Sequence, residues 1–223
     1  MTSVAVLFDL DGTLIDSAPD LHGAAARMLV AEGAEPLPFE TIRSFIGNGV
    51  PKLVERIIGA SGLAMADHAR LVAAFMAEYD AHATDLTRPY PGVADTLARL
   101  QAMGWGLGVV TNKPEAAARA ILAALDLARF FPVVVGGDTF PEKKPDPTGL
   151  IHAARRLGAS APVFVGDSEI DAETAERADM PFALFTEGYR KLPVFQIPHQ
   201  IGFSHFDRLP ALLEPVVSAH RLV

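Results

Sequence analysis

The chain has 223 residues, of which 50% are hydrophobic and 21% are charged, and its formal net charge at pH 7 is −8. This length fits one large domain or a domain with a smaller insert, and the composition is that of a folded globular protein. The acidic balance argues against nucleic-acid binding, and the absence of cysteine excludes disulfides, zinc–thiolate sites and cysteine nucleophiles.

The sequence predicts a cytoplasmic protein. Its first apolar run, residues 4–8, is too short for the core of a signal peptide and meets Asp9 at once. No apolar stretch reaches the roughly 18 residues that a membrane-spanning helix needs. We therefore expect neither nucleic acid nor membrane as a partner, and a monomer or homodimer as the working state.

The N-terminal part of the chain predicts one strand followed by a helical segment. VAVLF at 4–8 is continuously apolar, as expected of a strand covered on both faces. No strand pattern follows until about residue 88. Amphipathic helical stretches are expected there instead, at 18–32, 39–46, 50–59 and 66–83. We interpret this region as a helical insert between the first strand and the remaining sheet.

Strands and helices alternate in the rest of the chain. Apolar runs like the first predict four further strands, at 106–111, 132–137, 162–167 and 181–185. Helices are expected at 93–104, ending at Gly104, at 114–125, with Pro114 in the first turn, and at 146–158, with Asp146 as cap, Pro147 at the first helical position and Gly158 as stop. A closing helix broken at Pro215 is expected in the tail. This alternation predicts an α/β fold with a doubly wound, mainly parallel, Rossmann-like sheet.

Polar side chains follow four of the five predicted strands. In open α/β sheets ligands bind outside the carboxyl ends of the strands, so these positions are candidates for a site. In chain order they are Asp9 and Asp11, then Thr111, Asn112 and Lys113, then Lys143 and Lys144, then Asp167 and Asp171.

These residue types suit a phosphate site with a hard cation. Asp9, Asp11 and Asp167 would supply oxygen ligands to Mg²⁺, and without a cation such acids repel one another and their pKa values rise. Thr111, a lysine from 143–144 and the backbone N–H groups around Gly12 would bind the other oxygens of a phosphoryl group. Each motif alone is a common turn or cap, but their order at successive strand ends favours a functional site.

The same residues resemble the haloacid dehalogenase superfamily and the phosphatases within it. DLDGTL (9–14) matches the first motif completely, and VVTNK (109–113), KPDP (144–147) and GDSEID (166–171) are similar to the later motifs in the same order. The resemblance covers nearly the whole chain. It implies a core domain formed by 1–15 and 89–223 and a small helical cap domain formed by 16–88.

The resemblance also implies a mechanism and roles for the residues. Asp9 would be the nucleophile that forms an aspartyl-phosphate, and Asp11 the general acid and then the general base. Mg²⁺ would be held by the Asp9 carboxylate, the Asp11 backbone carbonyl and Asp167, with Asp171 acting through water. The phosphoryl oxygens would be bound by Thr111, Lys144, Gly12 and the Asn112 backbone N–H. Lys144 is preferred to Lys143 because it directly precedes Pro145.

The cap suggests a substrate. The stretch IRSFIGNGVPKLVERI (42–57) is similar to that of bacterial phosphoglycolate phosphatases, whose cap loop closes on the substrate. The candidate contacts to a small carboxylate are Arg43, Gly47, Asn48, Gly49 and Lys52. We therefore expect hydrolysis of 2-phosphoglycolate, a reaction of carbohydrate metabolism. A sugar-phosphate phosphatase, a pyrophosphatase, a phosphomutase and a phosphate-sensing module without turnover stay open as alternatives.

Overall fold

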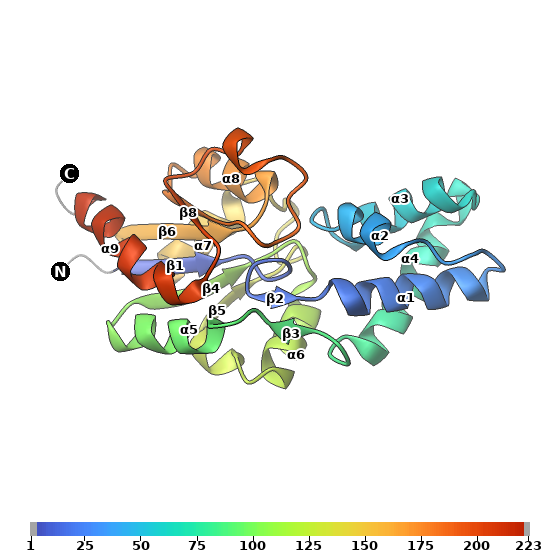
Figure 1. Ribbon diagram of the computed structural model, residues 1–223, viewed down its shortest axis with the longest axis horizontal. Coiled ribbons are helices and arrows are strands. Elements are labelled where there is room, and N and C mark those ends of the chain that lie inside the picture. Colours follow the sequence, from blue (N-terminus) through green and yellow to red (C-terminus); the bar gives the residue numbers. More distant parts are fainter. Residues whose placement is uncertain (1–3, 221–223) are drawn as a thin grey trace.

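The computed structural model describes residues 4–220, and its centre is a parallel β-sheet (Figure 1). The six strands follow the order β5-β4-β1-β6-β7-β8, and every neighbouring pair is parallel. The strands are β1 (Val4–Phe8), β4 (Gly106–Val110), β5 (Val133–Val135), β6 (Ala161–Gly166), β7 (Phe182–Phe185) and β8 (Ile201–Phe203).

Strand β1 lies in the middle of the sheet and is paired on both sides. Its last residue, Phe8, is in register with Val109 of β4 and with Val165 of β6. The carboxyl ends of these three strands are therefore level, and the residues that follow them emerge at one edge. The backbone N–H of Asp9 still donates to the Val165 carbonyl, which fixes its position against β6.

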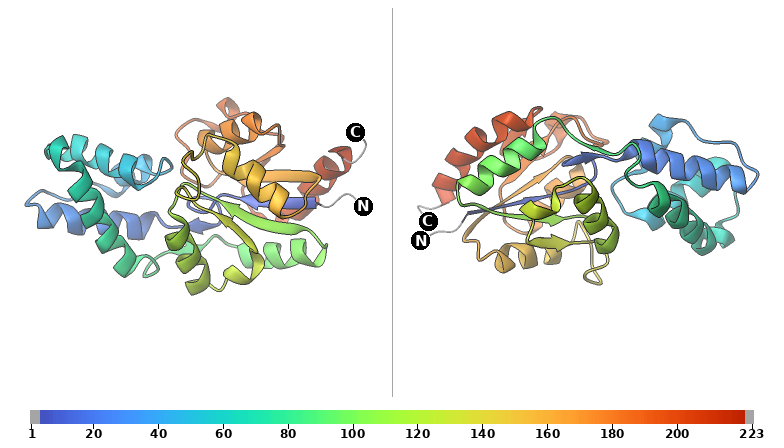
Figure 2. Two further views of the ribbon diagram at one scale, coloured as in Figure 1. Left: turned by 180° about the vertical axis from the view of Figure 1, so that it is seen from behind. Right: turned by 90° about the horizontal axis from the view of Figure 1, so that it is seen from below.

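Helices cover both faces of the sheet (Figure 2). One face packs against α5 (Val93–Ala102), α6 (Glu115–Ala124) and α9 (Leu209–His220), and the other packs against α7 (Thr148–Arg156) and α8 (Glu169–Arg177). In β1, Val6 and Phe8 face the first group and Leu7 the second, and all three are fully buried. Burial of both faces explains why the strand sequences are continuously apolar.

The segment between β1 and β4 forms a separate helical layer, on the right in Figure 1. It contains α1 (Ala18–Ala31), α2 (Phe39–Phe45), α3 (Val50–Ser61) and α4 (His68–His82). Helix α4 packs against α1 and α3, and its Phe75 and Tyr79 are fully buried between them. A short 3₁₀ helix, Met65–Asp67, lies between α3 and α4, and three others lie outside this layer, at Ala128–Phe130, Val194–Gln196 and Phe206–Arg208.

Two short strands carry the chain out to these helices and back. They are β2 (Ile15–Asp16) and β3 (Arg88–Pro89), which pair antiparallel. Beside them, the buried Asp20 carboxylate accepts hydrogen bonds from the Leu86 N–H (3.0 Å), the Thr87 N–H (2.7 Å) and the Thr87 hydroxyl (2.7 Å). Asp20 thus fastens the start of the helical layer to its end.

The predicted fold class is confirmed, and the five predicted strands are present. Strand β8 was missed because it has only three residues and an exposed glycine, Gly202, at its centre. Two helix predictions were wrong. Helix α7 begins at Thr148, with Pro147 as its cap residue, while Asp146 accepts a hydrogen bond from the Thr148 N–H.

The closing helix is not broken at Pro215. Helix α9 runs through this residue, which lies on its exposed face. There the carbonyl that loses its partner can bind water, and proline already has a helical φ. Buried Leu213 and Val217 hold the helix against the sheet on the other side. Within residues 4–220, no helix is long and apolar enough to cross a membrane.

We predict that Asp20→Ala lowers the free energy of unfolding by about 2–3 kcal/mol, because it leaves the buried N–H and hydroxyl of Thr87 and the partly buried N–H of Leu86 without their acceptor. Urea denaturation at pH 7 measures this. The control is Asp80→Ala, at an exposed position of α4, which should change stability by less than about 0.5 kcal/mol. Equal effects of the two substitutions would contradict the role given to Asp20.

Candidate active site

The Asp9 side chain lies at the carboxyl end of β1, next to a buried lysine. Its Oδ1 atom accepts a hydrogen bond from the Leu10 N–H (2.7 Å) and is 2.9 Å from the Lys144 Nζ. Both contacts use Oδ1, so they restrain the carboxylate through one oxygen and leave Oδ2 available to a ligand. Asp9 is 9% exposed, which keeps this oxygen within reach of a bound molecule.

Asp171 anchors Lys144 from the other side. Asp171 Oδ1 accepts a hydrogen bond from Lys144 Nζ (2.6 Å). Its Oδ2 accepts from the N–H groups of Asp167 (3.2 Å) and Ser168 (3.1 Å) and from the Ser168 hydroxyl (2.6 Å), a capping box at the start of α8. Because Asp171 Oδ2 is held at the start of α8, Asp171 Oδ1 has a fixed position and directs the Lys144 ammonium group toward Asp9.

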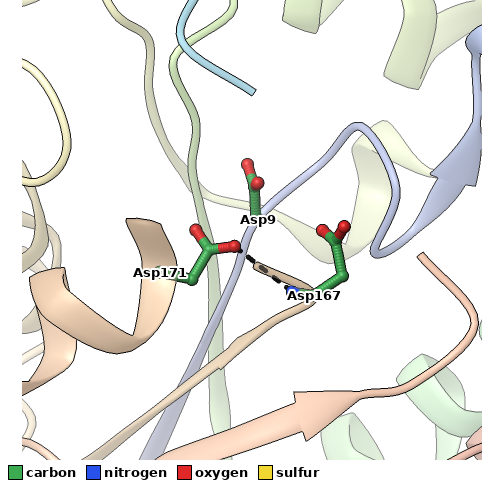
Figure 3. Close-up of side chains that lie close together, drawn as sticks. All are labelled: Asp9, Asp167 and Asp171. Carbon is green, nitrogen blue, oxygen red and sulfur yellow. Dashed lines mark hydrogen bonds between the residues drawn. The ribbon is translucent and has the colours of Figure 1, made fainter. Parts of the chain in front are cut away.

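Asp167, at the end of β6, completes an acidic cluster. Its Oδ1 accepts from the Thr13 hydroxyl (2.7 Å) and its Oδ2 from the Tyr189 N–H (2.6 Å). Asp9, Asp167 and Asp171 each offer an oxygen within 4.8 Å of the others (Figure 3). Thr13 and Tyr189 had no role in the sequence prediction, although Thr13 belongs to the DLDGTL stretch that it singled out.

The charges of this cluster favour a divalent cation. The three buried carboxylates share one ammonium group, Lys144, which contacts Asp9 and Asp171, so two negative charges stay uncompensated when all are ionised. Burial raises the pKa of Asp9 to about 7, although Lys144 opposes this. Burial, together with the charges of Asp171 and Asp9, also raises the pKa of Asp167 well above its usual range. Carboxylate oxygens in such an arrangement are ligands for a hard cation, and the residues fit one.

The Asp11 carboxylate is not part of this cluster and has partners of its own. Lys113 Nζ donates to both Asp11 oxygens, at 3.1 and 3.2 Å, and the Ser17 hydroxyl donates to Oδ1 at 2.6 Å. Burial alone would lower the pKa of Lys113, but Asp11 and Tyr79 raise it above its ordinary value. Lys113 was among the polar residues expected at the strand ends, but the sequence assigned it no role. It lies in the TNK stretch, but its direction toward Asp11 depends on the pairing of β1 with β4.

Thr111 and Asn112 follow β4 at the same edge. Both are more than nine-tenths buried. The Thr111 hydroxyl oxygen accepts from the Lys113 N–H (3.2 Å), so its proton stays free for a ligand. The Asn112 side-chain amide donates to the carbonyls of Gly47 (3.0 Å) and Lys144 (3.1 Å), and thus connects the helical layer to the loop of Lys144.

Two glycines allow the backbone to approach the cluster. Gly12 has a φ of +85°, and a Cβ atom there would lie 2.6 Å from Asp167 Oδ2. A Cβ atom on Gly188 would lie 2.3 Å from the Cβ atom of Asp167. Since neither distance is possible for real atoms, only glycine lets these loops close around the Asp167 side chain.

The loop between α2 and α3 covers Asp9. Gly47 and Gly49 line a small cavity of about 40 Å³ together with Asp9, Asp11 and Thr111. The rest of its wall is mainly apolar and comes from Leu21, Ile46, Val50 and Leu53. A space of this size holds only a few water molecules and is smaller than a phosphate ester.

The other three cap residues point elsewhere in this conformation. Arg43 donates to the Gly188 carbonyl (3.1 Å) and lies over the Tyr189 ring, in an outer groove. The Asn48 side chain accepts from Arg56 (2.8 Å), and Lys52 pairs with Glu55 on the exposed side of α3. Their contact with a substrate stays a prediction. Lys143 donates to the Asn48 carbonyl (3.1 Å), while Lys144 is the lysine inside the site.

A parallel sheet with acids at the ends of two neighbouring strands and a buried lysine beside them defines a Rossmann-like α/β protein with a candidate site for phosphoryl transfer. The chain matches the model of the haloacid dehalogenase-like hydrolase family over residues 6–185, and it belongs to that family.

Relatives with this architecture carry a more specific name. The chain is 47% identical over 215 residues to a phosphoglycolate phosphatase of Cereibacter sphaeroides, covering 96% of this chain and 99% of that one. A plasmid-encoded phosphoglycolate phosphatase of Cupriavidus necator is 44% identical over 218 residues, with 95% and 93% covered. The crystal structure of a predicted phosphoglycolate phosphatase from Haemophilus somnus has a TM-score of 0.89 at 29% identity, with 94% and 97% covered.

The raised pKa values predict how the stability of the metal-free protein depends on pH. A carboxyl whose pKa is higher in the folded state stabilises the fold at low pH, and this contribution is lost as the pH rises through the folded-state pKa. For Asp9, with a pKa of about 7, the free energy of unfolding in EDTA should fall between about pH 4 and 7. The loss should be about 2–4 kcal/mol.

Urea denaturation in EDTA at pH 5, 6, 7 and 8 tests this. Asp167→Asn removes one of the interacting charges and should flatten the dependence. A stability that does not change with pH in the wild type, or that rises toward pH 8, would contradict the account of the cluster.

Proposed function

We propose that this protein is a Mg²⁺-dependent phosphatase that hydrolyses 2-phosphoglycolate to glycolate and phosphate through an aspartyl-phosphate. The observation that carries the proposal is the fixed Asp9 carboxylate, whose Oδ1 is held by Lys144 and the Leu10 N–H. It faces a covered cavity beside an acidic cluster that needs a cation. The names of the relatives support the choice of substrate.

The proposed cation ligands are the Asp9 carboxylate, the Asp11 backbone carbonyl and Asp167, with Asp171 acting through water. Asp171 is assigned the indirect role because its two oxygens are engaged by Lys144 and by the start of α8. Bound Mg²⁺ would neutralise the charge of the cluster and polarise a phosphoryl oxygen.

In the first step, Asp9 Oδ2 attacks phosphorus. The bond from Oδ2 to phosphorus forms, the bond from phosphorus to the ester oxygen breaks, and Asp11 gives its proton to the departing oxygen. The Thr111 hydroxyl and Lys144 Nζ donate to the phosphoryl oxygens, with the N–H groups of Gly12 and Asn112 assisting. Lys144 is positioned for this by Asp171.

In the second step, water attacks phosphorus in the aspartyl-phosphate. Asp11 now accepts a proton from the water, the bond from Oδ2 to phosphorus breaks, and phosphate leaves with the Asp9 carboxylate restored. The reaction consumes one water and returns Asp11 to its protonated form. Phosphoryl transfer of this kind depends mainly on positioning and charge stabilisation.

We further propose that residues 16–88 form a cap that opens for the substrate and closes over it, on a core made of 1–15 and 89–223. The small size of the cavity over Asp9 and the narrow connection through β2 and β3 support this. Closure would exclude water from the first step. A cytoplasmic location and a monomeric or homodimeric state complete the proposal.

Phosphate release from a substrate panel tests the function. The panel contains 2-phosphoglycolate, glucose 1-phosphate, glucose 6-phosphate, pyrophosphate and an aryl phosphate, each with Mg²⁺ and with EDTA. We expect the highest kcat/KM for 2-phosphoglycolate and loss of activity in EDTA. Similar activity on every compound would remove the substrate assignment, and no release from any would contradict the enzyme assignment.

A matched pair of substitutions tests the choice of lysine. Lys144→Met should lower kcat by at least about 10³-fold, because it removes the cation that holds Asp9 and binds the phosphoryl group. Lys143→Met should change kcat by less than about 5-fold, since this lysine contacts only the cap loop backbone in the structure. Steady-state kinetics on 2-phosphoglycolate gives both values, and the reverse order would assign the role to Lys143.

A further inference from the structure

Asp11 is held by a lysine that is itself held by the cap. Lys113 Nζ is 3.1 and 3.2 Å from the two Asp11 oxygens and 2.8 Å from the Tyr79 hydroxyl. An ammonium group has three protons to donate, and these contacts are three in number. The Lys113 side chain is 4% exposed, so water offers little to replace a lost partner.

Tyr79 belongs to the cap and moves with it. It lies on α4, is 1% exposed, and its ring stacks on that of Phe75, with centroids 6.1 Å apart and planes at 16°. Lys113 Nζ also lies 4.5 Å from the centre of the Tyr79 ring. Lys113, in contrast, follows β4 in the core, so this contact spans the two parts of the chain.

We propose that Tyr79 is a positioning residue which, through Lys113, sets the direction of the Asp11 carboxylate when the cap is closed. This inference rests on the proposed function, in which Asp11 transfers protons to and from the substrate oxygen. Cap opening changes the position of Tyr79 relative to the core, and Lys113 then loses one of its three acceptors. Asp11 is thus in the correct direction for proton transfer only after the substrate is enclosed.

Hydrogen-bond loss at Tyr79 should affect substrates according to their leaving group. The departing alkoxide of 2-phosphoglycolate needs a proton, whereas acetate, the leaving group of acetyl phosphate, does not. The two compounds are similar in size, but only 2-phosphoglycolate carries a carboxylate, so each variant is compared with wild type on the same compound. If Tyr79→Phe only misorients the Asp11 carboxylate, kcat/KM should fall for 2-phosphoglycolate and stay nearly unchanged for acetyl phosphate. A general loss of structure should lower kcat/KM for both compounds.

The experiment compares kcat/KM of Tyr79→Phe and wild type on these two compounds with Mg²⁺. We expect a loss of about 10-fold or more on 2-phosphoglycolate and less than about 3-fold on acetyl phosphate. The control is Asp80→Ala, at an exposed position next to Tyr79 on α4, which should leave both values unchanged.

A double substitution tests whether Tyr79 acts through Asp11. In an Asp11→Asn background, Tyr79→Phe should lower kcat/KM by less than about 2-fold on either compound, because the proton-transferring group is already absent. Equal losses on both compounds in the single variant, or a full additional loss in the double variant, would overturn the inference. Absence of turnover by the wild type on both compounds would instead contradict the proposed function.

Discussion

The structure depends on the placing of three buried carboxylates at one edge of the sheet with a single lysine between them. Asp9, Asp167 and Asp171 lie close enough to share a ligand, and Lys144 Nζ contacts two of them. Burial of like charges is unfavourable, and here it is compensated only in part within the protein. This unbalanced charge favours the binding of a cation at the cluster.

The fold supplies the positions that this arrangement needs. The level ends of β1 and β6 bring Asp9 and Asp167 side by side, and the start of α8 holds Asp171 through its capping box. Glycines at 12 and 188 let two loops pass close to Asp167. The carboxylate of the remaining acid, Asp11, is kept apart from the cluster by Lys113 and Ser17, and this separation suits the proton transfer that we propose for it.

The core of the site could be predicted from the sequence because its signals are local. Asp9, Asp11, Thr111, Lys144 and Asp167 each follow a strand that is recognisable by its apolar run, and parallel pairing brings strand ends together. The contact of Lys113 with Tyr79 has no such signal, since it joins a strand end to a helix of the cap. Its existence depends on how the two parts pack.

The contacts of Arg43 and Asn48 could not be predicted from the sequence either. Arg43 and Asn48 lie in a stretch that the sequence singled out, but their side chains engage Gly188 and Arg56 in this conformation. The spacing of apolar residues in a helix predicts which face a residue occupies. It does not predict which residue of another part of the chain that side chain contacts. Helix α9 shows a different case, since an exposed Pro215 is tolerated where Leu213 and Val217 provide the packing.

The most direct test of the central claim is detection of the phosphate on Asp9. The enzyme would be mixed with 2-phosphoglycolate and Mg²⁺, quenched within milliseconds and treated with borohydride, which reduces an acyl phosphate to an alcohol. Mass spectrometry of the peptides would then locate the reduced residue. The account predicts homoserine at position 9 in the wild type. Reduction at another carboxylate, or turnover with no covalent intermediate at any time after mixing, would contradict it.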